Sequence, residues 1–179
     1  MRIGIIAIGR SGGYTLGSWI GLETDTEFIH EPLINGIKTD KDNVVIKWLY
    51  DEWIGLKERP VMDKWIGLIR ENERECAISH IRGKETDNWR NGYQLSDEWI
   101  REKEGEIKTE IEIIKGIQKG IHNIKGIELI VSYEGIYNRG EDIQRIKDYI
   151  GIENTKYLHL LDSSNRLRKV KENPPKRLI

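Results

Sequence analysis

The chain has 179 residues, of which 37% are hydrophobic and 33% are charged, a composition typical of one globular domain with its own core. Its 29 Lys and Arg side chains nearly balance its 30 Asp and Glu side chains. This balance excludes the global positive field on which non-specific nucleic-acid binding relies, so we expect no nucleic-acid partner and look for a local anion site.

The longest apolar run covers residues 3–8, far short of the ~20 residues that a membrane helix needs, so no membrane span is expected. Arg10 and a glycine cluster follow this run where a secretory signal would continue, so export is not expected. The single Cys76 cannot form an internal disulfide. We therefore predict a cytoplasmic protein, and the sequence leaves its oligomeric state open.

Five short apolar runs are expected to form buried strands, over residues 1–8, 27–30, 44–48, 76–81 and 127–132. Helices are expected over residues 15–22, 47–56, 61–72, 84–99, 100–122 and 141–150. Strands that alternate with helices form parallel βαβ units, which predicts an α/β fold with a sheet covered on both faces. One domain is expected over 1–179, with residues 162–179 as a basic C-terminal tail that is extended or loose.

The loop between the first strand and the first helix, residues 9–13 (GRSGG), is the strongest candidate for a binding site. Its glycines let backbone N–H groups approach an anion, and the helix N-terminus adds partial positive charge. Arg10 adds a full charge and Ser11 a hydroxyl. The spacing Gly4-x4-Gly9-Arg10-Ser11 also fits the P-loop pattern, although Gly4 would then lie inside the strand. The alternative is a glycine turn without a ligand.

Residues 8–16 (IGRSGGYTL) resemble the 5′-phosphosulfate loop of sulfotransferases, in which Lys or Arg precedes Ser-Gly. Residues 28–33 (FIHEPL) resemble the Glu-Pro strand end of many bacterial and carbohydrate members. Residues 76–82 (CAISHIR) resemble the strand ending in the Arg that holds the 3′-phosphate, and residues 130–136 (IVSYEGI) resemble a late family pattern. The resemblance suggests a small bacterial or phage-type member and implies a three-layer, P-loop-like fold with a central, mainly parallel sheet.

The same resemblance implies that 3′-phosphoadenosine 5′-phosphosulfate (PAPS) is the sulfuryl donor. The residues that it places around this nucleotide are Arg10, Ser11, Gly12, Gly13, Tyr14, Thr15, Arg82, Arg90 and Arg168. Arg90 stands where the family usually has a Ser, and an Arg there can still bind phosphate bidentately. The basic run around Arg168 is either a second partner of the 3′-phosphate or a solvated tail.

Catalysis of sulfuryl transfer requires charge neutralisation on the leaving phosphate and removal of a proton from the acceptor. Arg10 is expected to supply the first function. Glu31 is expected to be the general base because its strand should end beside the loop, with His30 as the second choice. Strand alternation should direct His30 and Glu31 to opposite sides. His80 is expected to be a structural histidine, and no residues stand at metal-ligand spacing, so no metal is predicted.

The sequence therefore predicts an enzyme that transfers a sulfuryl group from PAPS to a hydroxyl or amine of a small-molecule, glycan or peptide acceptor. One alternative is a P-loop nucleotide or small-molecule kinase, against which stand Arg10 in place of Lys and the lack of a strand-end Asp for Mg²⁺. The other is a degenerate nucleotide-binding module that has lost catalysis.

Overall fold

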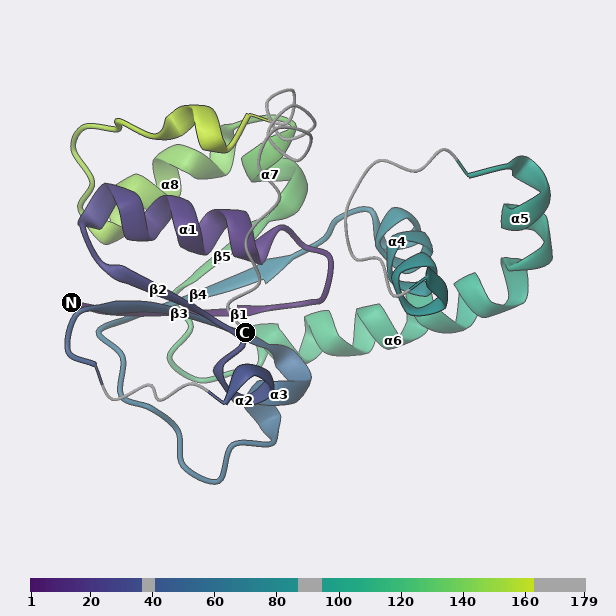
Figure 1. Ribbon diagram of the computed structural model, residues 1–179, viewed down its shortest axis with the longest axis horizontal. Coiled ribbons are helices and arrows are strands. Elements are labelled where there is room, and N and C mark those ends of the chain that lie inside the picture. The colour runs from purple at the N-terminus through teal and green to yellow at the C-terminus, as the bar shows by residue number, and fades with distance from the viewer. Residues whose placement is uncertain (37–40, 87–94, 163–179) are drawn as a thin grey trace.

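The computed structural model describes residues 1–36, 41–86 and 95–162 and contains one five-stranded sheet (Figure 1). The strands are β1 (Arg2–Ala7), β2 (Glu27–His30), β3 (Val44–Leu49), β4 (Lys64–Ile69) and β5 (Leu129–Ser132). Their spatial order is β2-β3-β1-β4-β5, and every neighbouring pair is parallel. The prediction of an α/β fold around a central parallel sheet is confirmed.

Eight α-helices and a 3-10 turn connect these strands within the described residues. They are α1 (Gly13–Thr24), α2 (Pro32–Asn35), α3 (Tyr50–Ile54), α4 (Glu73–Thr86), α5 (Asp97–Glu102), α6 (Glu104–His122), α7 (Tyr133–Tyr137), α8 (Glu141–Ile150) and η1 (Leu158–Leu160). None of the helices in this part of the chain is long and apolar enough to cross a membrane.

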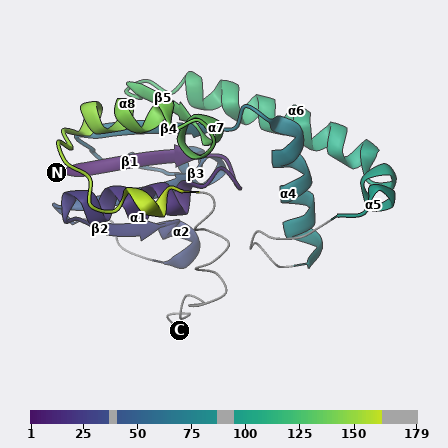
Figure 2. The same cartoon turned by 90° about the horizontal axis from the view of Figure 1, so that it is seen from above.

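The sheet separates two hydrophobic cores, because β1 sends successive apolar side chains to opposite faces. Ile3 and Ile5 pack with α1, α7 and α8, whereas Ile6 and Ile8 pack with α3, α4 and α6. Figures 1 and 2 show α1 and α8 over one face of the sheet, with α4, α5 and the start of α6 extending past the carboxyl ends of the strands. The result is a three-layer fold with its helical extension on the carboxyl side.

Two predicted elements are wrong in type. The segment 61–72, predicted as a helix, contains β4, and the segment 76–81, predicted as a strand, lies within α4. The run Trp65–Leu68 is apolar without alternation because β4 lies inside the sheet, and such a short run does not distinguish a buried strand from a helix. In α4 the buried positions are Cys76, Ala77, Ile81 and Gly83, which share one helical face.

The other boundaries differ by smaller amounts. The predicted helix 47–56 shortens to α3 because β3 continues through Leu49. The predicted helix 84–99 overlaps the end of α4 and the start of α5, with residues 87–94 outside the described part. The predicted helix 100–122 is divided at Lys103 into α5 and α6. Of the predicted tail, residues 163–179 also lie outside the described residues.

The packing of α1 on β2 requires a glycine at position 17. A Cβ atom built there would lie 2.1 Å from a ring carbon of Phe28. We expect Gly17→Ala to destabilise the fold by about 1–3 kcal/mol through overpacking. Gly116→Ala in α6 is the matched control, because nothing lies within 4 Å of a Cβ there. It should stabilise by up to about 1 kcal/mol. Urea unfolding measures the change in the free energy of unfolding for both variants. This packing would be contradicted if both substitutions destabilised the protein or both stabilised it.

Candidate functional site

The candidate site lies at the carboxyl edge of the sheet, between β1 and β4. The chain leaves β1 towards β2 on one side of the sheet and leaves β4 towards β5 on the other. In open α/β sheets, ligands bind in the crevice where neighbouring strands diverge in this way. The loop 8–12 and the segment that follows β4 both lie at this crevice.

The carbonyl oxygens of the loop are held by hydrogen bonds from the body of the protein. Ser11 Oγ donates to Ile8 O at 2.7 Å, and Cys76 Sγ donates to Gly9 O at 3.5 Å. Arg70 Nη1 donates to Arg10 O at 3.1 Å. Gly12 O accepts from Leu16 N at 3.1 Å and from Tyr137 OH at 2.8 Å. Because its carbonyl groups bind the protein, the loop is fixed in one conformation.

Three amide groups at the end of the same loop, unlike its carbonyl groups, have no hydrogen-bond partner among the described residues. They are the N–H groups of Ser11, Gly12 and Gly13. Arg10 and Gly12 have φ angles of 64° and 79°, in the left-handed region, so the backbone forms a concave turn before α1. Such consecutive amides at a helix N-terminus form an anion-binding site. The loop therefore has the backbone arrangement that anion-binding loops use.

The side chains of the loop contribute less than the sequence predicts. The Ser11 hydroxyl is buried and donates inward to Ile8 O. Tyr14 is 55% exposed, and its ring packs against Phe28 and His30. Arg10 is connected to α4, because its Nε donates to Ser79 Oγ at 2.8 Å. The main-chain amides thus carry most of the loop's capacity to bind an anion.

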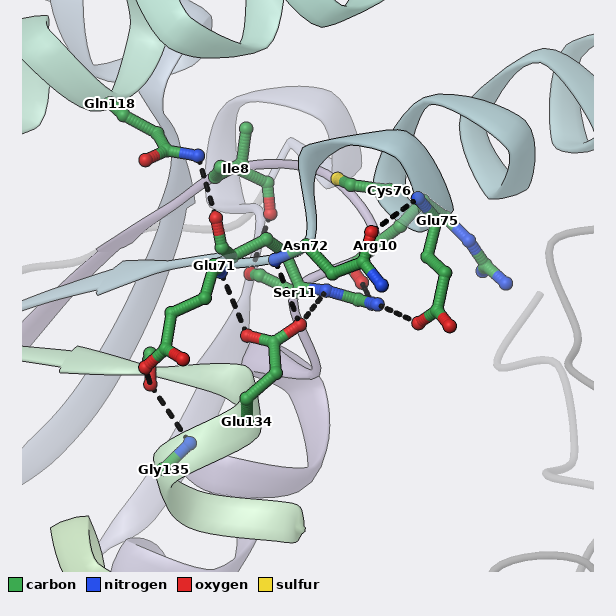
Figure 3. A network of polar contacts seen from close by, with 12 residues as sticks. Ile8, Arg10, Ser11, Glu71, Asn72, Glu75, Cys76, Gln118, Glu134 and Gly135 are labelled. Atoms are coloured by element: carbon green, nitrogen blue, oxygen red, sulfur yellow. Dashed lines mark hydrogen bonds and ion pairs between the residues drawn. The ribbon is translucent and has the colours of Figure 1, made fainter. Parts of the chain in front are cut away.

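A buried ion pair joins the loop to β4 and β5. Arg70 directly follows β4, and its Nε donates to a carboxylate oxygen of Glu134 at 3.0 Å. The Glu134 carboxylate also accepts from the amides of Glu71 and Asn72 at 2.8 and 3.3 Å (Figure 3). Because Arg70 also binds Arg10 O, this network positions the loop against two strands.

Three side chains, from β3, from β2 and from the residue that follows β2, meet on the other side of the loop. The buried Lys47 ammonium binds the Glu31 carboxylate, and His30 Nε2 lies 3.2 Å from the same carboxylate. The prediction that His30 and Glu31 point to opposite sides is wrong. The reason is that β2 ends at His30 and Glu31 has a left-handed φ of 47°, so strand alternation stops.

Burial changes the proton affinities in this cluster. It lowers the pKa of Lys47, and the adjacent Glu31 carboxylate opposes that change. Burial and then the charge of Lys47 lower the pKa of His30 to about 4. His30 is therefore neutral at pH 7 and a weak proton acceptor.

Lys47 is a residue of this cluster that was not predicted from the sequence. The lysine stands in an apolar run, and a charge inside a predicted buried strand was the available signal. A Cβ atom built on Gly13 would lie 3.1 Å from Lys47 Cε, so the lysine stem passes directly under the start of α1. Lys47 is thereby placed beside the anion-binding amides.

Arg82 was expected at the end of a strand, and the structure places it in a helix. Arg82 lies in α4 and not at a strand end, so the arginine that follows a strand at this edge is Arg70. Arg82 stands one helical turn after Ser79 and so shares its face of α4. The predicted binding residues Arg90 and Arg168 lie outside the described residues. Arg70 was not predicted because residues 61–72 were assigned to a helix, and Ser79 was not predicted because residues 76–81 were assigned to a strand.

Comparison with solved structures finds a crystal structure of mouse sulfotransferase SULT7A1 complexed with PAP, with a TM-score of 0.58 and 14% sequence identity. The similarity covers 98% of this chain and 68% of that chain. No protein-family model matches the sequence, and no curated protein sequence matches it. The chain therefore has a sulfotransferase-like, P-loop-like α/β fold, which agrees with the fold that the sequence resemblance implies.

Proposed function

We propose that the protein is a sulfotransferase that takes a sulfuryl group from PAPS and transfers it to a hydroxyl or amine of a small acceptor. The observation that carries this proposal is the row of available amides at Ser11, Gly12 and Gly13, with Arg10 and Lys47 beside it. The sulfotransferase-like fold and the PAP bound to the similar mouse protein support the choice of nucleotide.

Sulfuryl transfer consists of three changes in bonding. The bond between sulfur and the bridging oxygen of the 5′-phosphate breaks, a bond between sulfur and the acceptor oxygen forms, and the acceptor proton passes to a base. Charge grows on the phosphate as it leaves, and the loop amides, Arg10 and Lys47 are the donors that would stabilise it. These donors are held in place before the reaction, which lowers the cost of reorganisation.

The 3′-phosphate of the nucleotide needs separate donors. Ser79 and Arg82 lie on one face of α4, and Ser79 already contacts the Arg10 side chain. We propose this face of α4 as the 3′-phosphate site, with Arg90 and Arg168 as further candidates from the sequence. PAPS binding, a cytoplasmic location and a bacterial or phage origin remain predictions.

Glu31 has a role in this scheme through Lys47. Its carboxylate binds the ammonium and so holds it beside the loop, while its own action as general base stays a prediction. If Glu31 acts as the general base, Glu31→Gln should lower the chemical step by roughly 10²–10⁴-fold, with donor affinity little changed. Glu27→Gln is the matched control, because Glu27 lies at the far end of β2 with a half-exposed side chain. Single-turnover kinetics compares the variants, and equal rates would remove Glu31 from the mechanism.

The kinase alternative is less compatible with the geometry. Its P-loop pattern requires Gly4 in the loop, but Gly4 lies within β1, where a Cβ would lie 2.1 Å from the Trp65 ring.

The degenerate binding module differs from our proposal only in turnover. It would bind the nucleotide with unchanged affinity in the Glu31→Gln variant and transfer nothing in either form.

Calorimetry with three nucleotides tests the proposed function. Adenosine 3′,5′-bisphosphate should bind more tightly than ADP or ATP, because the proposed pocket requires a 3′-phosphate. Equal binding of all three, or a preference for ATP with Mg²⁺, would favour the kinase. Transfer assays in excess chelator complete the test: activity that resists the chelator supports sulfuryl transfer, and strict Mg²⁺ dependence contradicts it.

A further inference from the structure

A second buried carboxylate, besides that of Glu31, lies near enough for its charge to act on Lys47. It belongs to Glu52, the third residue of α3, which is 9% exposed. One oxygen of Glu52 accepts from Leu33 N at 2.6 Å, and the other accepts from Leu49 N at 3.3 Å. Glu52 therefore joins the segment that follows β2 to the end of β3.

The hydrogen bond to Leu33 fixes the turn that carries Glu31. Glu31 N donates to Lys47 O at 2.8 Å, and the chain then turns with a left-handed φ of 47° at Glu31, which a residue other than glycine adopts at a cost. Leu33 lies in the first turn of α2, whose N–H groups have no partner within the helix. The turn is thus held on one side by β3 and on the other by Glu52, with α2 beside α3 (Figure 1).

The charge of Glu52 also affects Lys47. The lysine side chain is 5% exposed, and burial lowers its pKa, whereas the carboxylates of Glu31 and Glu52 oppose that change. His30, the residue of β2 in register with Lys47, is neutral at pH 7 because its own pKa is lowered to about 4. On β1 the residue in register is Ile5. Two carboxylates, from α3 and from the turn after β2, therefore stabilise the charged form of the buried amine.

We propose that Glu52 is a positioning residue that fixes the Glu31 turn and holds the Lys47 ammonium beside the loop amides, an inference that rests on the proposed sulfuryl transfer. Glu52 touches neither the nucleotide nor the acceptor in this scheme and acts only through Glu31 and Lys47. A residue that only caps α3 would need an acceptor for Leu49 N and no charge. The role of the charge therefore separates the two possibilities.

Titration of Lys47 tests this role without any ligand. Carbon NMR of Lys47 Cε over the alkaline pH range gives the midpoint, and Lys47→Arg identifies the signal. Glu52→Gln keeps an acceptor for Leu33 N but removes the charge, so the ammonium loses a favourable partner and the midpoint should fall by about half a pH unit or more. Glu58→Gln, in the exposed segment after α3, is the matched control and should leave the midpoint unchanged.

The affinity for adenosine 3′,5′-bisphosphate gives the second readout. Calorimetry should show an affinity that falls in alkaline solution as Lys47 loses its proton, and in Glu52→Gln this fall should begin at lower pH. In a Lys47→Gln background, Glu52→Gln should change the affinity by less than about twofold at every pH, because residues that act through one another are not additive.

Two results would overturn the proposal. One is an unchanged Lys47 midpoint in Glu52→Gln, and the other is an effect of Glu52→Gln on affinity that persists in the Lys47→Gln background. Glu52→Asp keeps the charge but is too short to bind both amides, so it should lower the midpoint by less, and it serves the same titration if Glu52→Gln does not fold. If the wild type binds no adenosine 3′,5′-bisphosphate, the proposed function fails, and the titration still decides whether Glu52 holds Lys47.

Discussion

Arg10→Ala should lower sulfuryl transfer by at least about 10²–10³-fold while the protein stays folded. Arg10 is the charged side chain of the loop itself, and its backbone is fixed through Arg10 O, which binds Arg70. The substitution therefore removes the guanidinium without removing the hydrogen bond that anchors the loop. Initial rates with PAPS measure the loss, and circular dichroism and thermal unfolding measure the fold.

Two further variants make this result specific. Arg10→Lys keeps a positive charge but loses the planar donor group, so it should retain more activity than Arg10→Ala. Arg101→Ala, on α5, removes an exposed arginine away from the loop and should leave the rate unchanged. A near-normal rate in Arg10→Ala would remove this side chain from the proposed chemistry.

Glu134→Ala should destabilise the protein by about 3–5 kcal/mol, the largest effect on stability that we expect. The substitution leaves the buried Arg70 guanidinium without its main partner and frees the amides of Glu71 and Asn72. The Glu75 carboxylate, 3.2 Å from Arg70 Nη2 but 67% exposed, compensates this buried charge only in part, and such a charge is costly because it has left water. Urea unfolding gives the free energy, and catalytic loss should accompany it because Arg70 anchors the loop.

The control for this stability effect is Glu112→Ala. Glu112 pairs with Lys115 on α6, but its side chain is 73% exposed, so the change should be within about 0.5 kcal/mol. If Glu134→Ala proves too unstable to study, Glu134→Gln should give an intermediate loss, because an amide oxygen still accepts from backbone N–H groups. A loss below about 1 kcal/mol for Glu134→Ala would contradict the role of the network.

The parts of the fold that the sequence predicts are those set by local patterns. The apolar run 3–8, the glycines at 9, 12 and 13 and the following helical pattern identify β1, the loop and α1 without any knowledge of distant contacts. Local pattern fails for the runs 65–68 and 76–81. Both are short and apolar, and their type depends on what surrounds them, a sheet on both sides for β4 and a single packed face for α4.

The residues of the candidate site also fall into those that a local pattern predicts and those that only the fold brings together. The loop is contiguous, so its glycines and its place before a helix are visible in the sequence. Lys47, Arg70 and Glu134 come together only through the order of strands in the sheet, which places distant segments side by side. The pair of His80 with Glu110 likewise depends on the packing of α4 against α6. His80 was expected to be structural because it alternates with Ile78 on a predicted strand.

A crystal structure with adenosine 3′,5′-bisphosphate is the measurement that tests the central claim most directly. We expect the 5′-phosphate oxygens to accept hydrogen bonds from the amides of Ser11, Gly12 and Gly13, with Arg10 and Lys47 in contact and the 3′-phosphate against α4. A nucleotide bound elsewhere, or bound at the loop with its 3′-phosphate in solvent, would contradict the account.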